Sequence, residues 1–125
     1  MLTLSILNEE FAICRLDADS PVPSWALAGS LSSITRTADE LSIVCAQNQA
    51  PKDTQCNRDW RCLKVDGPLD FSLTGVMASL VAPMAEAEIS IFVFSTFDTD
   101  YLMVKESNLE KAIRALTDAG HEVRR

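Results

Sequence analysis

The stretch that most constrains the fold of this chain is Ile89–Val104, which reads ISIFVFSTFDTDYLMV. Two of its segments, Ile89–Ser95 and Tyr101–Val104, are rich in β-branched and aromatic residues, which favour the pleated backbone of a strand. The link between them, Thr96–Asp100, is short, polar and acidic, so the stretch predicts a β-hairpin. The first strand is apolar on both faces, which predicts a central strand covered on both sides.

Two later patterns predict helices around this hairpin. In Ser72–Ala87 the apolar residues recur every three or four positions and form one continuous stripe. A second stripe begins at Leu109 and is followed by Gly120, a residue type that commonly ends helices. His121–Arg125 then predicts a short edge strand, with His121 exposed. Together with a strand at Trp60–Val65, the second half of the chain reads β–α–β–β–α–β.

The first half of the chain contains strand patterns without a long helical one. Leu2–Asn8 and Phe11–Leu16 alternate around a polar break and predict a hairpin, Leu41–Cys45 predicts a strand, and Gln47–Asp59 resembles a linker. A shift of 61 residues places Thr35–Ile43 on Thr96–Val104. We therefore interpret the first half as a decayed copy with shortened or lost helices, and divide the chain into modules 1–59 and 60–125.

Composition and charge exclude several classes of function. The net charge of −7 argues against nucleic acid, whose phosphates require a basic surface. No apolar run approaches the roughly 20 residues that cross a bilayer, and the N-terminus lacks the basic start of a signal peptide. We therefore expect a cytoplasmic protein that contacts neither nucleic acid nor membrane.

The residues that usually carry catalysis or bind metals are scarce. The four cysteines have no CxxC spacing and only one histidine is present, so we expect no metal, no cofactor and reduced thiols. The cysteines are Cys14, Cys45, Cys56 and Cys62. No Ser/His/Asp or Cys/His arrangement is evident, and we expect a protein that is not an enzyme.

Three segments resemble the small bacterial ACT-domain proteins related to the CASTOR arginine sensors, and so do the helix and strand predicted at Leu109–Val123. The three segments are Ser30–Cys45 (SLSSITRTADELSIVC), Asp66–Leu80 (DGPLDFSLTGVMASL) and Ile89–Val104. The resemblance implies an α+β fold of tandem ACT modules, each a ferredoxin-like βαββαβ unit with an antiparallel sheet and helices on one face. It also implies a regulatory, amino-acid-binding role without catalysis, with the ligand held between modules, and a homodimer.

The same resemblance implies where the amino acid binds: at the start of the first helix and at the turn after the next strand. In this sequence the positions are Leu73, Thr74, Gly75, Val76, Ser95, Thr96, Phe97, Asp98 and Asp100. Free N–H groups in a first helical turn suit a ligand carboxylate, and aspartates suit an ammonium or a cationic side chain.

Each of these positions also has a simpler explanation. Gly75 could serve helix–sheet packing, and Asp98 and Asp100 could serve turn chemistry, since Asp bonds nearby backbone N–H groups. The competing function is a protein-interaction module whose ancestral pocket is filled by side chains. The sequence leaves open which amino acid is bound, which protein responds, and whether one chain or two complete the site.

Overall fold

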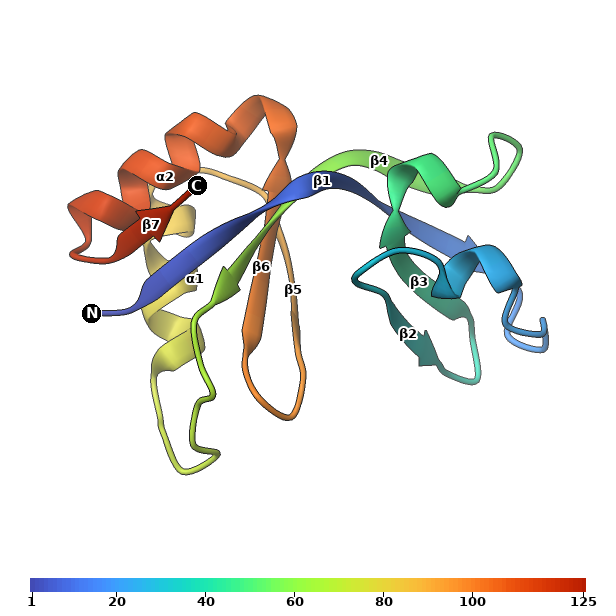
Figure 1. Ribbon diagram of the computed structural model, residues 1–125, viewed down its shortest axis with the longest axis horizontal. Coiled ribbons are helices and arrows are strands. Elements are labelled where there is room, and N and C mark those ends of the chain that lie inside the picture. The colour runs from blue at the N-terminus through green and yellow to red at the C-terminus, as the bar shows by residue number, and fades with distance from the viewer. The chain divides into compact units, whose positions relative to one another are not determined.

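The computed structural model describes all residues, Met1–Arg125, and divides into two compact units. The larger unit contains Met1–Asn8 and Arg61–Arg125, and the smaller unit contains Glu9–Trp60 (Figure 1). Two long strands, β1 (Thr3–Leu16) and β4 (Cys56–Val65), contribute residues to both units. The units thus differ from the predicted modules mainly in residues 1–8, because the first part of β1 pairs with β7 (Glu122–Arg124).

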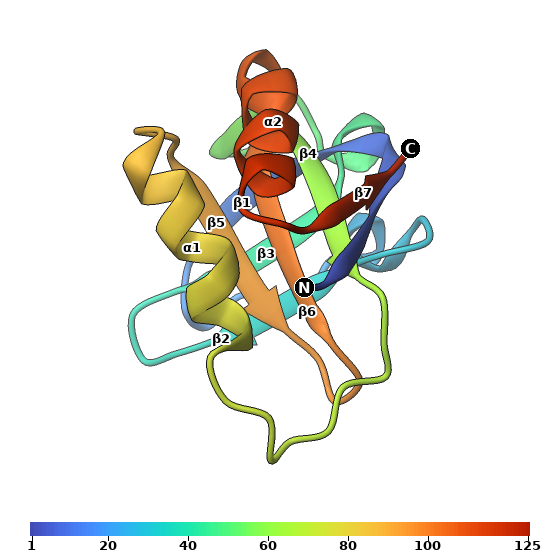
Figure 2. The same ribbon diagram turned by 90° about the vertical axis from the view of Figure 1, so that its left-hand side faces the viewer.

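The larger unit is a sheet with two helices on one face. Its strands follow the order β7-β1-β4-β6-β5, with β5 spanning Ile91–Ser95 and β6 spanning Asp100–Lys105. Helices α1 (Val76–Glu86) and α2 (Leu109–Asp118) both lie in front of the strands in Figure 2. A short 3₁₀ turn, η3 (Glu106–Asn108), precedes α2. This arrangement confirms the predicted α+β class and the βαββαβ element order.

The predicted central position of the Ile89–Ser95 strand is wrong. The strand pairs only with β6 in the sheet order and forms the sheet edge, with Val93 37% exposed. Its partner β6 lies next to β4 and is the buried member of the hairpin, since Leu102, Met103 and Val104 are fully buried. Apolar residues on both faces therefore mark an edge strand here.

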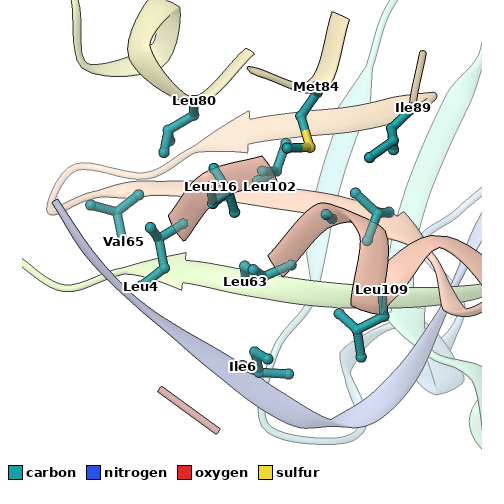
Figure 3. Packing of buried hydrophobic residues seen from close by; sticks show 12 residues of the cluster. Leu4, Ile6, Leu63, Val65, Leu80, Met84, Ile89, Leu102, Leu109 and Leu116 are labelled. Atoms are coloured by element: carbon teal, nitrogen blue, oxygen red, sulfur yellow. The ribbon is translucent and has the colours of Figure 1, made fainter. Parts of the chain in front are cut away.

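The core of the larger unit lies between the sheet and the two helices. Leu80 and Met84 project from α1, and Leu109 and Leu116 project from α2, onto strand residues (Figure 3). The strand residues are Leu4, Ile6, Leu63, Val65, Leu102 and Val104. Burial of such side chains contributes roughly 1.5–3 kcal/mol each. No helix in the structure has the length and apolar character needed to span a membrane.

His121 is buried, which contradicts the exposed position predicted for it. Its exposure is 8%, and both ring nitrogens are hydrogen-bonded. The backbone N–H of Leu2 donates to Nδ1 over 3.0 Å, and Nε2 lies 3.1 Å from the carbonyl oxygen of Ser79. Pro83, four residues after Ser79 in α1, has no N–H to give that carbonyl its helical bond. His121 supplies the missing donor.

The smaller unit has four strands and no α-helix. The order is β2-β3-β1-β4, with β2 at Ser33–Arg36 and β3 at Leu41–Ala46. Only two 3₁₀ turns, η1 (Ser24–Leu27) and η2 (Gln47–Gln49), occur in its connections. The prediction of shortened or lost helices is confirmed, whereas the predicted hairpin within residues 2–16 is wrong because β1 is continuous.

Both units place a hairpin beside the strand that precedes it: β2–β3 beside β1, and β5–β6 beside β4. The turns share one hydrogen-bond pattern, in which Thr37 N–H donates to Glu40 O and Thr96 N–H donates to Thr99 O. Thr37 therefore matches Thr96, a shift of 59 residues (96 − 37) and not the predicted 61. A slip of two residues preserves the faces of a strand, so the alternation alone cannot detect it.

The smaller unit is closed by a disulfide between Cys14 and Cys56. These residues lie at the end of β1 and the start of β4, with their Cα atoms 4.1 Å apart. Cys45 and Cys62 are free and buried. The expectation of four reduced thiols is therefore wrong for Cys14 and Cys56, whose spacing in the sequence gives no sign that the strands bring them together.

Candidate functional site

A hollow of about 230 Å³ opens between two segments of the larger unit. One is the loop 66–75, which leads from β4 to α1, and the other is the turn 96–99 between β5 and β6. Figure 2 shows this loop and the hairpin beside each other below the helices. The hollow is lined by Leu69, Asp70, Phe71, Leu73, Val76, Ser95, Thr96, Phe97, Asp98, Thr99 and Asp100.

Hydrogen bonds hold the two segments together. The hydroxyl of Thr99, which is buried, donates to the carbonyl oxygen of Val65 over 2.7 Å. The backbone N–H of Leu69 donates to the carbonyl oxygen of Asp98, also over 2.7 Å. These bonds connect the turn to the end of β4 and to the loop, the two segments that line the hollow.

The charged lining of the hollow is entirely acidic. It includes Asp70, Asp98 and Asp100, and no lysine, arginine or histidine. The N–H of Ser72 donates to the Asp70 carboxylate over 2.8 Å, and this bond lowers the pKa of Asp70 below its ordinary value. Asp100 accepts a bond of 2.6 Å from the Ser95 hydroxyl on the facing strand. Such a lining attracts a cationic group.

The start of α1 contributes backbone donors beside these carboxylates. The helix begins at Val76, not at Ser72 as predicted, because Asp70 engages Ser72 in a local turn. No side chain caps this end, and its first turn contains no acidic residue. The first N–H groups of a helix have no intrahelical partner, and the helix dipole gives them partial positive charge. Val76 is itself part of the lining.

Gly75 is the N-cap of α1 and adopts the left-handed conformation, with φ 76°. A Cβ atom added at this position would meet no atom within 4 Å. Helix–sheet packing therefore does not explain the glycine, whereas the backbone conformation does.

We expect Gly75→Ala to destabilise the protein by about 1–2 kcal/mol, the cost of left-handed backbone for a residue with a Cβ atom. Urea denaturation of both proteins measures the difference. Gly120→Ala is the matched control, because Gly120 also has positive φ (96°) and open space around it, but lies at the far end of α2. A negligible loss for Gly75→Ala beside a clear loss for Gly120→Ala would show that the α1 start relaxes to another conformation.

Two exposed aromatic rings stand at the rim of the hollow. Phe71 and Phe97 meet edge to face, with centroids 4.8 Å apart, although they are 73% and 80% exposed. Leu73 beside them is 54% exposed. Large apolar side chains gathered at one exposed place are typical of a surface that binds something.

The structure brings most of the predicted site residues to this hollow. Leu73, Val76, Ser95, Thr96, Phe97, Asp98 and Asp100 line it, whereas Thr74 and Gly75 precede α1 without lining it. Sequence reasoning missed Leu69, Asp70 and Phe71, whereas Thr99 lies within the predicted turn Thr96–Asp100. The spacing of Asp70 and Ser72 was a usable signal, because Asp commonly accepts a bond from the N–H two residues later.

The βαββαβ order with both helices on one face of the sheet defines a ferredoxin-like domain. The predicted antiparallel sheet is correct for the β5–β6 pair and wrong for β7, which pairs in parallel with β1. The sequence profile of the ACT domain family matches residues 55–118, and a second profile, for an N-terminal domain, matches residues 9–53. The chain belongs to the ACT domain family.

Three known proteins illustrate the relationship. The human cytosolic arginine sensor for mTORC1 subunit 1 is 36% identical to this chain over 104 residues. The match covers 79% of this chain but only 32% of the length of the human protein. A crystal structure of a protein from Agobacterium tumefaciens has a TM-score of 0.93 and 44% identity, covering 98% of this chain and 91% of that one.

The regulatory subunit of aspartate kinase from Thermus thermophilus has the same fold at low identity. Its TM-score is 0.67 with 13% identity, covering 96% of this chain and 99% of that chain. The fold is thus shared with the regulatory subunit of an aspartate kinase, and the sequence is related to that of a protein named for sensing arginine.

Proposed function

We propose that this protein is a regulatory protein that binds an amino acid in the hollow between loop 66–75 and the β5–β6 turn. One observation carries the proposal: segments that are distant in sequence form a hollow that combines three carboxylates with the open start of α1. An amino acid presents the matching pair of groups, an ammonium and a carboxylate. The volume of about 230 Å³ lies below that of sites for drug-sized ligands and suits a small molecule.

The charges suggest how the amino acid would lie. Its carboxylate would approach the first N–H groups of α1, and its cationic group would approach Asp98 and Asp100. With three acidic side chains and no basic one, the lining favours a ligand with a second positive charge. The human relative is named an arginine sensor, and we propose a cationic amino acid as the first ligand to test.

We further propose that the ligand is held at an interface between ACT modules, in a homodimer. A hollow rimmed by Phe71, Leu73 and Phe97, all more than half exposed, leaves a ligand open to water unless another surface covers it. β5 forms the sheet edge and carries half-buried apolar side chains, and an exposed sheet edge can pair with a second copy.

The competing proposal is an ACT-type interaction module that binds no small ligand. Two observations favour it: the exposed Phe71–Phe97 pair, and the engagement of Asp100 by its own Ser95 hydroxyl. Against it stands the open hollow, which side chains do not fill.

A regulatory role implies a protein without catalysis, and we propose a cytoplasmic location, as for the cytosolic relative.

The proposal is tested by a thermal-shift screen against the common amino acids at millimolar concentration. A ligand at about 100 times its Kd stabilises the folded state by ~2.7 kcal/mol, which raises Tm by several degrees in a domain of this size. A selective rise with a cationic amino acid supports the sensor. A flat screen overturns it in favour of the interaction module.

For the stabilising amino acid we expect Asp100→Asn to weaken binding by about 10- to 100-fold, the effect of losing a charge-assisted hydrogen bond. Isothermal titration calorimetry measures the loss. Asp39→Asn is the matched control, because it removes the same charge from the equivalent turn of the smaller unit. Equal affinities for Asp100→Asn and the unaltered protein would show that the site residues are wrong.

A further inference from the structure

The smaller unit contains a hairpin, β2–β3, that corresponds to the β5–β6 hairpin beside the hollow. The two hairpins differ at one position that bears on ligand binding. With Thr37 matched to Thr96, Asp39 matches Asp98, and Arg36 matches Ser95. The strand register agrees, since Arg36 pairs with Leu41 at the end of β2 and Ser95 pairs with Asp100 at the end of β5. The lining pair Ser95–Asp100 is thus replaced by Arg36–Leu41.

In the larger unit this pair leaves a place for a cation. Asp100 is half-buried and its carboxylate belongs to the lining of the hollow. In the smaller unit the matching Leu41 is fully buried and offers no charge. The smaller unit therefore lacks the carboxylate that a cationic ligand would require at this place.

The side chain of Arg36 instead supplies a cation of its own. Its guanidinium donates to the carbonyl oxygen of Ala18 and, over 2.8 Å, to that of Ser20. Both carbonyls lie in the loop that follows β1, as loop 66–75 follows β4. The guanidinium thus joins hairpin to loop, as Leu69 and Asp98 do through their backbones in the larger unit.

We propose that Arg36 is a tethered ligand: its guanidinium occupies, in the smaller unit, the place that corresponds to the hollow. The smaller unit is then permanently occupied, and each chain keeps a single open site, in the larger unit. The count of one site per chain rests on the proposed function, whereas the tethered guanidinium does not.

The test is chemical rescue of the full-length Arg36→Ser protein, which receives the residue present at Ser95. Without its two charged donors, loop 17–32 is expected to be cleaved by a protease about 10-fold faster than in the unaltered protein. Methylguanidinium chloride at millimolar concentration should restore most of the protection from the protease, because it presents the same planar set of N–H donors. Methylammonium chloride, a cation without that planar set of donors, should restore little.

Arg58→Ser is the matched control. Arg58 also donates to a backbone carbonyl of this unit, that of Pro51 over 2.8 Å, but lies on β4 and does not contact the β2–β3 turn through this bond. We expect no rescue of this variant. Absence of rescue in Arg36→Ser, or equal rescue in Arg58→Ser, overturns the proposal whether or not the larger unit binds an amino acid. Calorimetry that finds two ligands per unaltered chain overturns the single-site count alone.

Discussion

Opening the Cys14–Cys56 disulfide is expected to lower the free energy of unfolding by about 4 kcal/mol. The bond closes a loop across a sequence separation of 42, and the loss of unfolded-chain entropy for that length gives this magnitude. The smaller unit depends on it because a unit of this size, without an α-helix, has a small core. That core consists mainly of Ala12, Ala26, Leu41, Ile43, Cys45 and Ala50 around the disulfide.

Urea denaturation with and without dithiothreitol measures the effect. The double variant Cys14→Ser/Cys56→Ser is the control, because the reductant should not change its denaturation midpoint. Iodoacetamide and mass spectrometry confirm which thiols are free. Burial raises the pKa of Cys62 to about 12 and also raises that of Cys45, so both thiols stay protonated and unreactive at neutral pH. An unchanged midpoint in a protein shown to be reduced would contradict the structural role of the bond.

Replacing His121 with alanine is expected to cost about 2–4 kcal/mol, since it leaves two partly buried backbone groups without their side-chain partner. The groups are the N–H of Leu2 and the carbonyl of Ser79, on the chain start and on α1. Thermal or urea denaturation measures the loss. His121→Gln, whose amide can donate toward Ser79, is expected to retain part of the stability.

Pro83 provides an internal check on this explanation. In Pro83→Ala the backbone N–H of residue 83 can bond Ser79 directly, so His121 becomes less important. We therefore expect His121→Ala to cost about 1 kcal/mol less in that background, a coupling typical of residues in one hydrogen-bond network. Strict additivity in the double-mutant cycle would show that His121 and Pro83 are not linked through Ser79.

Local sequence patterns predicted most elements of the larger unit, but not which strands become neighbours. Apolar residues on both faces of β5 indicated a central strand, yet β5 is the edge and β6 is buried. β1 lies between β7 and β4 in the sheet. This pairing joins residues that are far apart in the sequence, so no local hydrophobic pattern predicts it. The polar residues Asn8, Glu9 and Glu10 suggested a break where β1 continues without interruption.

The candidate site was predictable in part because its residues were inferred from a family resemblance. That resemblance pointed to the start of α1 and the β5–β6 turn, and both contribute to the hollow. Asp70 and Phe71 were missed because the resemblance pointed only to the start of the helix, and no local pattern shows that the preceding loop lies against the β5–β6 turn. His121 was misjudged because its partners, Leu2 and Ser79, are far from it in sequence.

The most direct test of the central claim is an amide ¹H–¹⁵N titration of the protein with the amino acid selected by the thermal-shift screen, beginning with L-arginine. We predict that the shifted amides are those of residues 69–79 and 95–100, around the hollow and the start of α1. The matching turn of the smaller unit, Thr37–Glu40, should not respond. Shifts centred on that turn, or no shifts at millimolar ligand, would contradict an amino-acid site in the hollow.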